Sequence, residues 1–526
     1  MQKKIILILF SILGIFPHWG CAFDSAQNKE ANIDLTKKMF FASEVVQFVS
    51  PSKKFPSNTS DVIIENNSGK ILNTKIIAND SLITLGKMDV GWYKVSLNQN
   101  NGNTEFSFVV VPDRRNQNYK ESKFGIHLKI DSLGLEKIKY LGAGWIRLHG
   151  TGSDILKWSL VEKKQGEYNW HYNLIKPFID KGYGILANVG LCPLWASSNP
   201  TAESYPNKST YFGPYAYVPS NMSLWKGYLE KAYGQYRNAI DYWEIWNEPD
   251  IQFLVSPNKV EDYQKLLGSA LEVKQENDGN FKIAAPAIAY YFINDNPNNQ
   301  YKYPGNTGVK YRDPGFLTGF LNRSLSEDID VFSFHHYMGI KADQYNYTEK
   351  EFNNYYEKIN YLKKKLPNKK IFLTEFNVHS DNKEYNAQID QLLANLLVFQ
   401  HLQLFSVGVD KIFTYTAVER NSWAVWNNFF YNGDNPTQVF QAYSVMTSYL
   451  TGYNLTSRNF NPDNGIITFN CSNGKNTIII YFASKDINIT ISSDCIISDY
   501  LGKSLNVSKG AQFNLNRNHI YYKLPR

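Results

Sequence analysis

The spacing of hydrophobic residues divides the chain into three regions. From about residue 30 to 112, short runs alternate polar and apolar positions between turns that contain Asn and Gly. A period of two is typical of half-buried antiparallel strands, so this region is predicted to be a β-sandwich of Ig-like (immunoglobulin-like) size. Polar residues 113–121 follow as a linker. Short alternating runs return from residue 453 to 526, which predicts a small C-terminal β-domain.

Between residues 120 and 450, apolar runs alternate with longer stretches of helical character. Repeated strand–helix units close into a (β/α)8 barrel, so the predicted fold class is α/β, a TIM barrel flanked by the two β-domains. Its active site should lie at the C-terminal ends of the strands, with the polar segment Asn294–Asp313 as a loop over that face. The eight predicted strands are Phe124–Leu128, Trp145–His149, Gly184–Val189, Tyr242–Trp246, Lys282–Ala285, Val331–His335, Ile371–Thr374 and Lys411–Tyr415.

Two of these apolar strands lead directly into a glutamate. Glu248 follows the fourth strand in the sequence DYWEIWNEPD, and Glu375 follows the seventh in KIFLTEFN. A carboxylate at the end of an apolar strand is costly unless it is paired or used. Two such groups are what the hydrolysis of a glycosidic bond requires. One protonates the leaving oxygen, and the other attacks the anomeric carbon or activates water.

Strand alternation predicts that further polar side chains point into the barrel. The bulky apolar face of each strand should pack on the helices, which leaves the opposite face for the lumen. A single inward His or Arg could be a satisfied core residue, but polar groups that converge from five strands indicate a functional site. Glu244 lies deeper and is expected to form a buried ion pair with an arginine. The side chains predicted to converge with the two glutamates are His127, Arg147, His149, His335 and Tyr337.

These motifs resemble clan A of the glycoside hydrolases, which are retaining (β/α)8 enzymes. The resemblance rests on Asn247-Glu248-Pro249 at the fourth strand and on Glu375 at the seventh, and it covers roughly residues 124–450. Within the clan, the chain is most similar to family 39, the group with β-xylosidases and some bacterial exopolysaccharide endoglycosidases. The stretches that favour this family are Glu244–Asp250 (EIWNEPD), Pro193–Ala196 (PLWA), Gly166–Trp170 (GEYNW) and Ser333–Tyr337 (SFHHY).

The resemblance implies a role for each matching residue. Glu248 would be the acid/base and Glu375 the nucleophile. Asn247 would hold the sugar 2-hydroxyl, Tyr337 would touch the nucleophile carboxylate, and Arg147 would keep that carboxylate ionised. The remaining candidate sugar contacts are His127, His149 and His335, with Trp195 and Trp423 as stacking platforms or, alternatively, as rim packing.

The sequence therefore predicts a retaining β-glycosidase that hydrolyses O-glycosidic bonds of a poly- or oligosaccharide by double displacement. Its two carboxyl groups should lie ~5–5.5 Å apart. It should need no cofactor and no metal, and no Cys/His spacing resembles a metal site. One alternative is a non-catalytic polysaccharide-binding protein on a barrel scaffold. An inverting hydrolase, with a wider carboxylate gap, is another.

The N-terminus indicates export. Two lysines precede the apolar run 5–16, which is too short to span a bilayer, and Gly20-Cys21-Ala22 fits a small-x-small cleavage site. Residues 1–22 are thus predicted to be the signal peptide of a secreted or periplasmic protein, and Cys21 could alternatively carry a lipid anchor. No transmembrane helix is expected in the mature chain. The net charge of +7 forms no dense basic stripe, which argues against nucleic-acid binding.

Two further expectations concern single residues. Cys192 is predicted to be a packed thiol, whereas Cys471 and Cys495 could form a disulfide in an oxidising compartment or remain thiols. Trp92 and Tyr93 are adjacent aromatics on one predicted strand of the N-terminal sandwich. Alternation sends them to opposite faces, so at most one could stack on a sugar, which favours a spacer.

Overall fold

The computed structural model of the protein describes most of the chain. Trp423 and the predicted signal peptide with Cys21 lie outside the described residues, as does most of the predicted loop Asn294–Asp313. The described ranges are 37–49, 62–72, 77–79, 82–98, 104–114, 118–202, 212–289, 291, 313–341, 344–381, 386–417, 425–426, 429–431 and 434–525.

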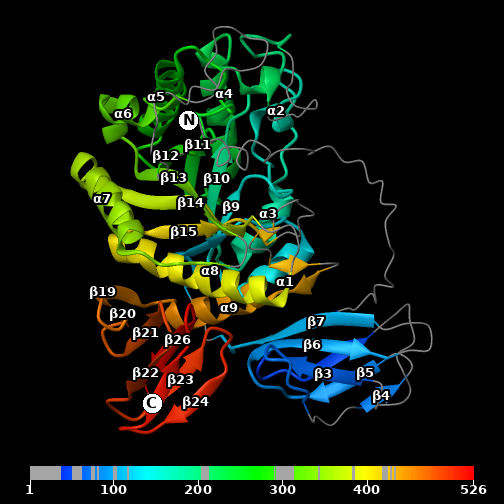
Figure 1. Cartoon of the computed structure of the whole chain (residues 1–526). Coiled ribbons are helices and arrows are strands. Elements are labelled where there is room, and N and C mark those ends of the chain that lie inside the picture. Colours follow the sequence, from blue (N-terminus) through cyan, green and yellow to red (C-terminus); the bar gives the residue numbers. More distant parts are fainter. Residues whose placement is uncertain are drawn as a thin grey trace, which may run out of the picture. The chain divides into compact units, whose positions relative to one another are not determined.

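Within these ranges, eight parallel strands close into a barrel (Figure 1). Neighbouring strands follow the order of the sequence, and pairing between β13 and β14 closes the sheet. All eight strands lie where the sequence predicts them, and the predicted fold class is confirmed. The strands are β8 Phe124–Ile126, β9 Trp145–Leu148, β10 Gly184–Val189, β11 Tyr242–Ile245, β12 Ile283–Ile288, β13 Val331–Ile340, β14 Lys370–Ser380 and β15 Lys411–Thr414.

The barrel strands are buried along nearly their whole length. Every residue of β10 (GILANV) and β12 (IAAPAI) is buried. Parallel strands covered on both faces read as continuous apolar runs, which is why they stand out in the sequence. Strands β13 and β14 continue several residues past the predicted ends, and β14 also pairs with the short antiparallel strand β16 (Val425–Trp426).

Helices connect the strands, and several begin and end where the sequence supplies a cap. The Asp131 side chain accepts from the Gly134 amide to start α1, which ends at Gly142 with φ of 69°. Asn386 caps α8 in the same way, and Gly408 ends it. The helices are α1 Ser132–Leu141, α2 Trp158–Val161, α3 Tyr172–Asp180, α4 Met222–Tyr236, α5 Lys259–Glu276, α6 Phe316–Leu321, α7 Glu349–Lys365, α8 Ala387–Val407 and α9 Gln438–Leu450.

The N-terminal region forms two small sheets that share one core. Phe48 and Ile83 from one sheet pack in the same apolar cluster as Tyr93 and Phe108 from the other. On the strand that carries Trp92 and Tyr93, buried and partly exposed residues alternate, and Tyr93 faces the core. One sheet has the order β1 (Met39–Phe41), β7 (Thr104–Val111), β6 (Gly91–Leu97), β3 (Val62–Asn66), and the other has β2 (Val46–Val49), β5 (Leu82–Gly86), β4 (Ile77–Asn79).

The C-terminal region is an antiparallel β-domain. The three cysteines within the described ranges, Cys192, Cys471 and Cys495, are buried free thiols, so no disulfide joins the last two. The main sheet has the order β19 (Asn454–Asn461), β20 (Ile466–Ser472), β21 (Thr477–Ala483), β26 (Ile520–Leu524), β23 (Cys495–Asp499), β24 (Ser504–Val507), and β22 (Ile487–Thr490) pairs with β25 (Gln512–Leu515).

The described chain folds as two compact units. The first comprises residues 147–336 and 360–375, and the second comprises residues 37–146, 337–359 and 376–525. In the second unit, the N-terminal sheets contact the hairpin β17–β18 (Phe430–Tyr431 and Asn435–Pro436), because Trp92 Nε1 and Ser107 Oγ both donate to the Pro436 carbonyl at 2.8 and 2.7 Å. No helix in the described ranges has both the length and the apolar character needed to cross a membrane.

Candidate active site

Glu248 lies in a tightly constrained turn after β11. Both Trp246 and Glu248 have left-handed backbone conformations, with φ of 66° and 42°. Such conformations cost non-glycine residues of the order of 1 kcal/mol each and are often found at functional sites. The turn is held because the Trp246 indole donates to the Phe253 carbonyl at 2.6 Å and the Glu248 amide donates to the Ala287 carbonyl at 3.0 Å.

The residues after Glu248 are fixed as well. The Asp250 carboxylate is buried and accepts from the Ala289 amide at 2.9 Å. The buried Lys259 ammonium donates to the Ile251 carbonyl at 2.6 Å and to the Leu254 carbonyl. The turn is therefore held from both sides, and its glutamate can keep one orientation.

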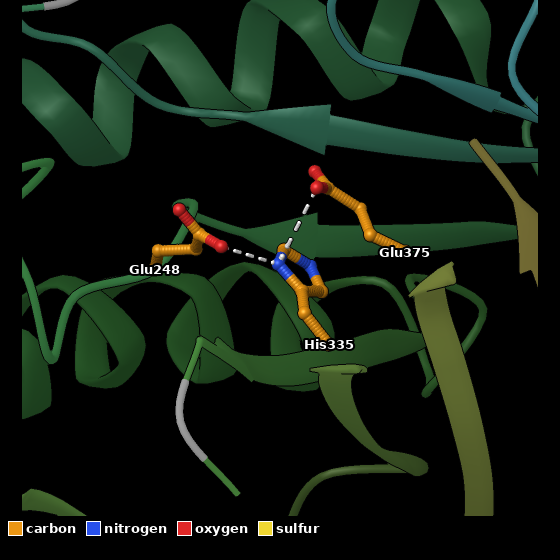
Figure 2. Close-up of side chains that lie close together, drawn as sticks. All are labelled: Glu248, His335 and Glu375. Atoms are coloured by element: carbon orange, nitrogen blue, oxygen red, sulfur yellow. Dashed lines mark hydrogen bonds and ion pairs between the residues drawn. The ribbon is translucent and has the colours of Figure 1, made fainter. Parts of the chain in front are cut away.

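Glu248 and Glu375 approach the same imidazole. Figure 2 shows the two carboxylates with His335 between them. The distance from His335 Nδ1 to Glu248 Oε1 is 2.8 Å, and that to Glu375 Oε2 is 3.7 Å. One ligand atom of each of the three side chains lies within 4.8 Å of the others. A carboxylate oxygen of Glu248 and one of Glu375 are thus closer to each other than the ~6.5–9.5 Å that separates the carboxyl groups of inverting glycosidases.

Arg147 joins the strands that carry the catalytic candidates. Its side chain is fully buried, and its three nitrogens donate to three different residues: Nη1 to Glu375 Oε1 at 2.6 Å, Nη2 to Asn247 Oδ1 at 2.8 Å and Nε to Glu244 Oε2 at 2.7 Å. Burial alone would lower the pKa of Arg147, but attraction to Glu244 and Glu375 raises it, so the guanidinium stays charged. The buried ion pair expected for Glu244 is present.

The surroundings of Glu248 favour its protonated form. Burial raises the pKa of Glu248 to about 7, and the charges of Glu375 and Asp250 add to the effect, whereas His335 opposes it. Burial lowers the pKa of His335, but the two glutamates outweigh this and raise it. The Glu248–His335 pair therefore retains a proton near neutral pH, and Glu375 is paired with a permanent cation. One carboxyl group is equipped to give a proton and the other to act as an anion.

A comparison with known protein families agrees with this arrangement. Residues 195–443, which include both glutamates, match the family described as "Glycosyl hydrolase catalytic core". This part of the chain is similar to a glycoside hydrolase catalytic core. No curated protein matches the sequence.

Solved structures of glycoside hydrolases share the fold. A family 39 glycoside hydrolase from Bacteroides cellulosilyticus WH2 is 16% identical, with a TM-score of 0.68 over 93% of this chain and 99% of that one. A family 39 β-xylosidase from Caulobacter crescentus is 12% identical, with a TM-score of 0.51 over 79% and 98%. A family 30 subfamily 8 xylanase from Clostridium acetobutylicum is 14% identical, with a TM-score of 0.50 over 76% and 95%. These structures share the (β/α)8 fold that the resemblance to clan A implies.

Two more predicted site residues lie in the first unit. His149 Nε2 lies 3.6 Å from Glu375 Oε1, and its Nδ1 lies 3.9 Å from Asp154. Trp195, in the loop after β10, is partly exposed. Its Nε1 donates to the Glu162 carbonyl at 2.8 Å, and its ring meets Trp158 edge-on at 5.7 Å. His149 thus lies beside the candidate nucleophile, and the Trp195 ring is held in place.

His127 and Tyr337 belong to the second unit, and both contact Tyr415, a residue that follows β15. The buried His127 ring lies 4.8 Å from the Tyr415 ring, and the partly buried Tyr337 ring lies 6.3 Å from it. Both residues are predicted to face the barrel lumen, and both rings contact the same residue, Tyr415. The sequence reasoning did not single out Tyr415, because an aromatic residue at the end of an apolar strand gives no signal beyond packing.

Glu248, His335 and Glu375 are also spaced so that they could hold a metal ion. Two ligands of a tetrahedral zinc ion at bond lengths of ~2.0–2.2 Å lie about 3.4 Å apart. His335 Nδ1 and Glu248 Oε1 are closer than that, at 2.8 Å, which is the length of a direct hydrogen bond. Arg147 already donates to Glu375. The observed contacts therefore correspond to a hydrogen-bonded acid and a paired anion.

Proposed function

We propose that this glycoside hydrolase is a retaining β-glycosidase that acts by double displacement. Glu375 attacks the anomeric carbon while Glu248 protonates the leaving oxygen, which gives a covalent glycosyl-enzyme. Glu248 then takes a proton from water, and that water attacks the anomeric carbon to release Glu375. The observation that carries the proposal is the pair of close carboxyl groups with opposite surroundings: Glu248 with a pKa of about 7 and Glu375 bonded to Arg147.

The neighbouring residues fit the steps of this mechanism. Asn247 Oδ1 accepts from Arg147, so its amide nitrogen is the group that would donate to the sugar 2-hydroxyl. That hydrogen bond strengthens in the transition state of a glycosidase. His149 lies beside Glu375, where it would contact a neighbouring hydroxyl of the same sugar. Trp195 would stack on a sugar at the rim.

Export of the protein is part of the proposal. The basic and apolar segment at residues 1–16 and the small residues around Cys21 support a secreted or periplasmic enzyme, with a lipid anchor on Cys21 as the alternative. An extracellular location suits a substrate as large as a polysaccharide. Mass spectrometry of the mature N-terminus would distinguish cleavage after residue 22 from a lipidated Cys21.

The configuration of the first product tests the mechanism directly. A panel of aryl β-glycosides should include xylosides, because one structural neighbour is a β-xylosidase. Proton NMR of the hydrolysis should show the β-anomer first, with the α-anomer rising later by mutarotation. An initial α-anomer would mean inversion. Tight binding of glycans without hydrolysis would support the alternative of a non-catalytic binding protein.

A further inference from the structure

A layer of buried polar residues lies next to the catalytic candidates, and the proposed mechanism gives it no role. It consists of Lys157, Asn188 and Glu244, all of them buried. Asn188 on β10 and Glu244 on β11 are register partners across the parallel pair, which brings their side chains together. The backbone of Lys157 pairs with Gly190, just beyond the end of β10. An amide in the middle of an otherwise apolar strand is costly unless it is fully hydrogen-bonded.

The Asn188 amide contacts both halves of the catalytic apparatus. Its nitrogen donates to Glu244 Oε2 at 2.8 Å, and that same oxygen accepts from Arg147, which in turn donates to Glu375. The Asn188 nitrogen also donates to the Trp246 carbonyl at 2.5 Å, two residues before Glu248. One side chain is thus linked to the partner of the nucleophile and to the strained turn that carries the acid.

Lys157 determines which way round the amide sits. Its ammonium donates to Asn188 Oδ1, so the amide nitrogen must face Glu244 and Trp246. If the amide were flipped, its nitrogen would face the Lys157 amine, which is also a donor. Its oxygen would face the Glu244 carboxylate and the Trp246 carbonyl, which are both acceptors. Burial lowers the pKa of Lys157 to about 7, although Asp154 opposes this. The amine can donate to Oδ1 in either protonation state.

We propose that Asn188 is a positioning residue that aligns both catalytic carboxylates at once, with Lys157 fixing its orientation. The inference rests on the roles proposed for Glu248 and Glu375. It assigns a function to residues that do not touch the substrate. If the layer only filled the core, its loss would lower stability and leave the ionisation of the catalytic pair unchanged.

The main test is Asn188→Asp in the full-length enzyme, with kcat/KM for an activated aryl β-glycoside measured from pH 4 to 9. An added carboxylate beside Glu244 disfavours ionisation of the neighbouring carboxyl groups, so both limbs of the profile should move to higher pH. Asn188→Leu removes the donor without adding charge. It should lower kcat by about 10- to 100-fold with a smaller change in KM, because misplaced groups slow the chemistry.

Asn395→Asp is the matched control. Asn395 is also buried, accepts from the Ile520 amide at 2.8 Å and donates to the Gln391 carbonyl at 2.9 Å, in contacts with the C-terminal domain and within α8. The Asn395→Asp variant should have a lower free energy of unfolding than the wild type and the same pH profile of kcat/KM. Folded Asn188 variants whose profiles and kcat match this control would overturn the inference. If neither Asn188 variant folds, the pH profile of kcat/KM is measured for Lys157→Met instead. Its acidic limb should move to higher pH. An unchanged profile would contradict the inference.

A parallel measurement separates this inference from the proposed function. Glu375→Ala should be inactive and rescued by azide if the proposed function is right. If that holds and the Asn188 variants behave like the control, only the positioning role fails. If Glu375→Ala keeps its activity, the proposed function itself fails, whatever the Asn188 variants do.

Discussion

Arg147 and Glu375 form a buried ion pair, with 2.6 Å between Nη1 and Oε1. Breaking such a pair by removing one partner leaves an unpaired buried charge, which costs several kcal/mol. His149 Nε2 and His335 Nδ1 also lie near the Glu375 carboxylate, at 3.6 and 3.7 Å. The proposed nucleophile is therefore paired with a permanent cation and held in place before a substrate arrives.

The pH dependence should follow Glu248. The acid must be protonated to work, and burial raises the pKa of Glu248 to about 7, so kcat/KM should fall as the pH rises through about 7. His335 lowers this pKa by its hydrogen bond and charge. His335→Phe should therefore move the basic limb to higher pH. A basic limb that stays in place in His335→Phe would contradict the assignment of that limb to Glu248.

Glu248→Ala should separate substrates by their leaving group. A poor leaving group needs the proton, so its hydrolysis should slow by about 10²–10⁴-fold. An activated aryl glycoside should still form the glycosyl-enzyme, which then accumulates because its hydrolysis lacks a base. Stopped-flow release of the aryl group should show a burst followed by a slow steady rate. Equal losses on both kinds of substrate would argue against the acid/base role.

His401 should make the fold acid-sensitive. Its ring is buried in α8, with Nδ1 at 2.7 Å from the Leu397 carbonyl and Nε2 at 3.1 Å from Thr414 Oγ1. Burial lowers the pKa of His401 to about 4. The unfolded chain binds a proton near pH 6.5 and the folded chain does not, so stability should be lost as the pH falls from about 6.5 to about 4.

The size of that loss at pH 4.5 should be roughly 2–3 kcal/mol. The measurement is urea unfolding of the wild type and of His401→Gln at pH 7 and at pH 4.5. The advantage of the wild type over the variant should shrink by this amount at the lower pH. A constant difference between the two proteins would show that His401 does not titrate on unfolding.

The N-terminal sheets should act as a spacer. Tyr93 faces the core of the sheets, and the Trp92 indole donates to the Pro436 carbonyl, so both aromatics are already used in packing. In a Glu375→Ala background, Trp92→Ala should lower the melting temperature and leave retention on soluble and insoluble glycans unchanged. Ser96→Ala, a partly exposed position on the same strand, is the control. Glycan retention that is lost with Trp92 would overturn the spacer prediction.

The eight strands could be predicted because parallel barrel strands are apolar on both faces. The ends of β13 and β14 could not. Beyond His335, β13 continues as HYMGI, and beyond Glu375, β14 continues with polar residues such as Asn377 and His379. The pairing of β13 with β14, and of β14 with β16, supplies their hydrogen bonds, and such long-range pairing leaves no local signal.

Some residues of the candidate site could likewise be predicted from the sequence, and others could not. The sequence predicted that Arg147 and His335 lie near the two glutamates. Side chains alternate between the two faces of a strand, so their positions along the strands show which ones point into the barrel. The sequence did not identify Asn188 or Lys157 as part of the site. An asparagine within an apolar strand reads as a satisfied core residue, and nothing local connects it to a lysine 31 positions earlier.

Azide rescue of Glu375→Ala is the most direct test of the central claim. The variant should lose turnover, because the carboxylate that forms the glycosyl-enzyme is gone. Azide should enter the space left by the carboxylate and restore part of the rate on an activated aryl β-glycoside. NMR should identify the product as the α-glycosyl azide, of inverted configuration. Wild-type activity in Glu375→Ala, or a rescued product of β configuration, would contradict the assignment of Glu375 as the nucleophile.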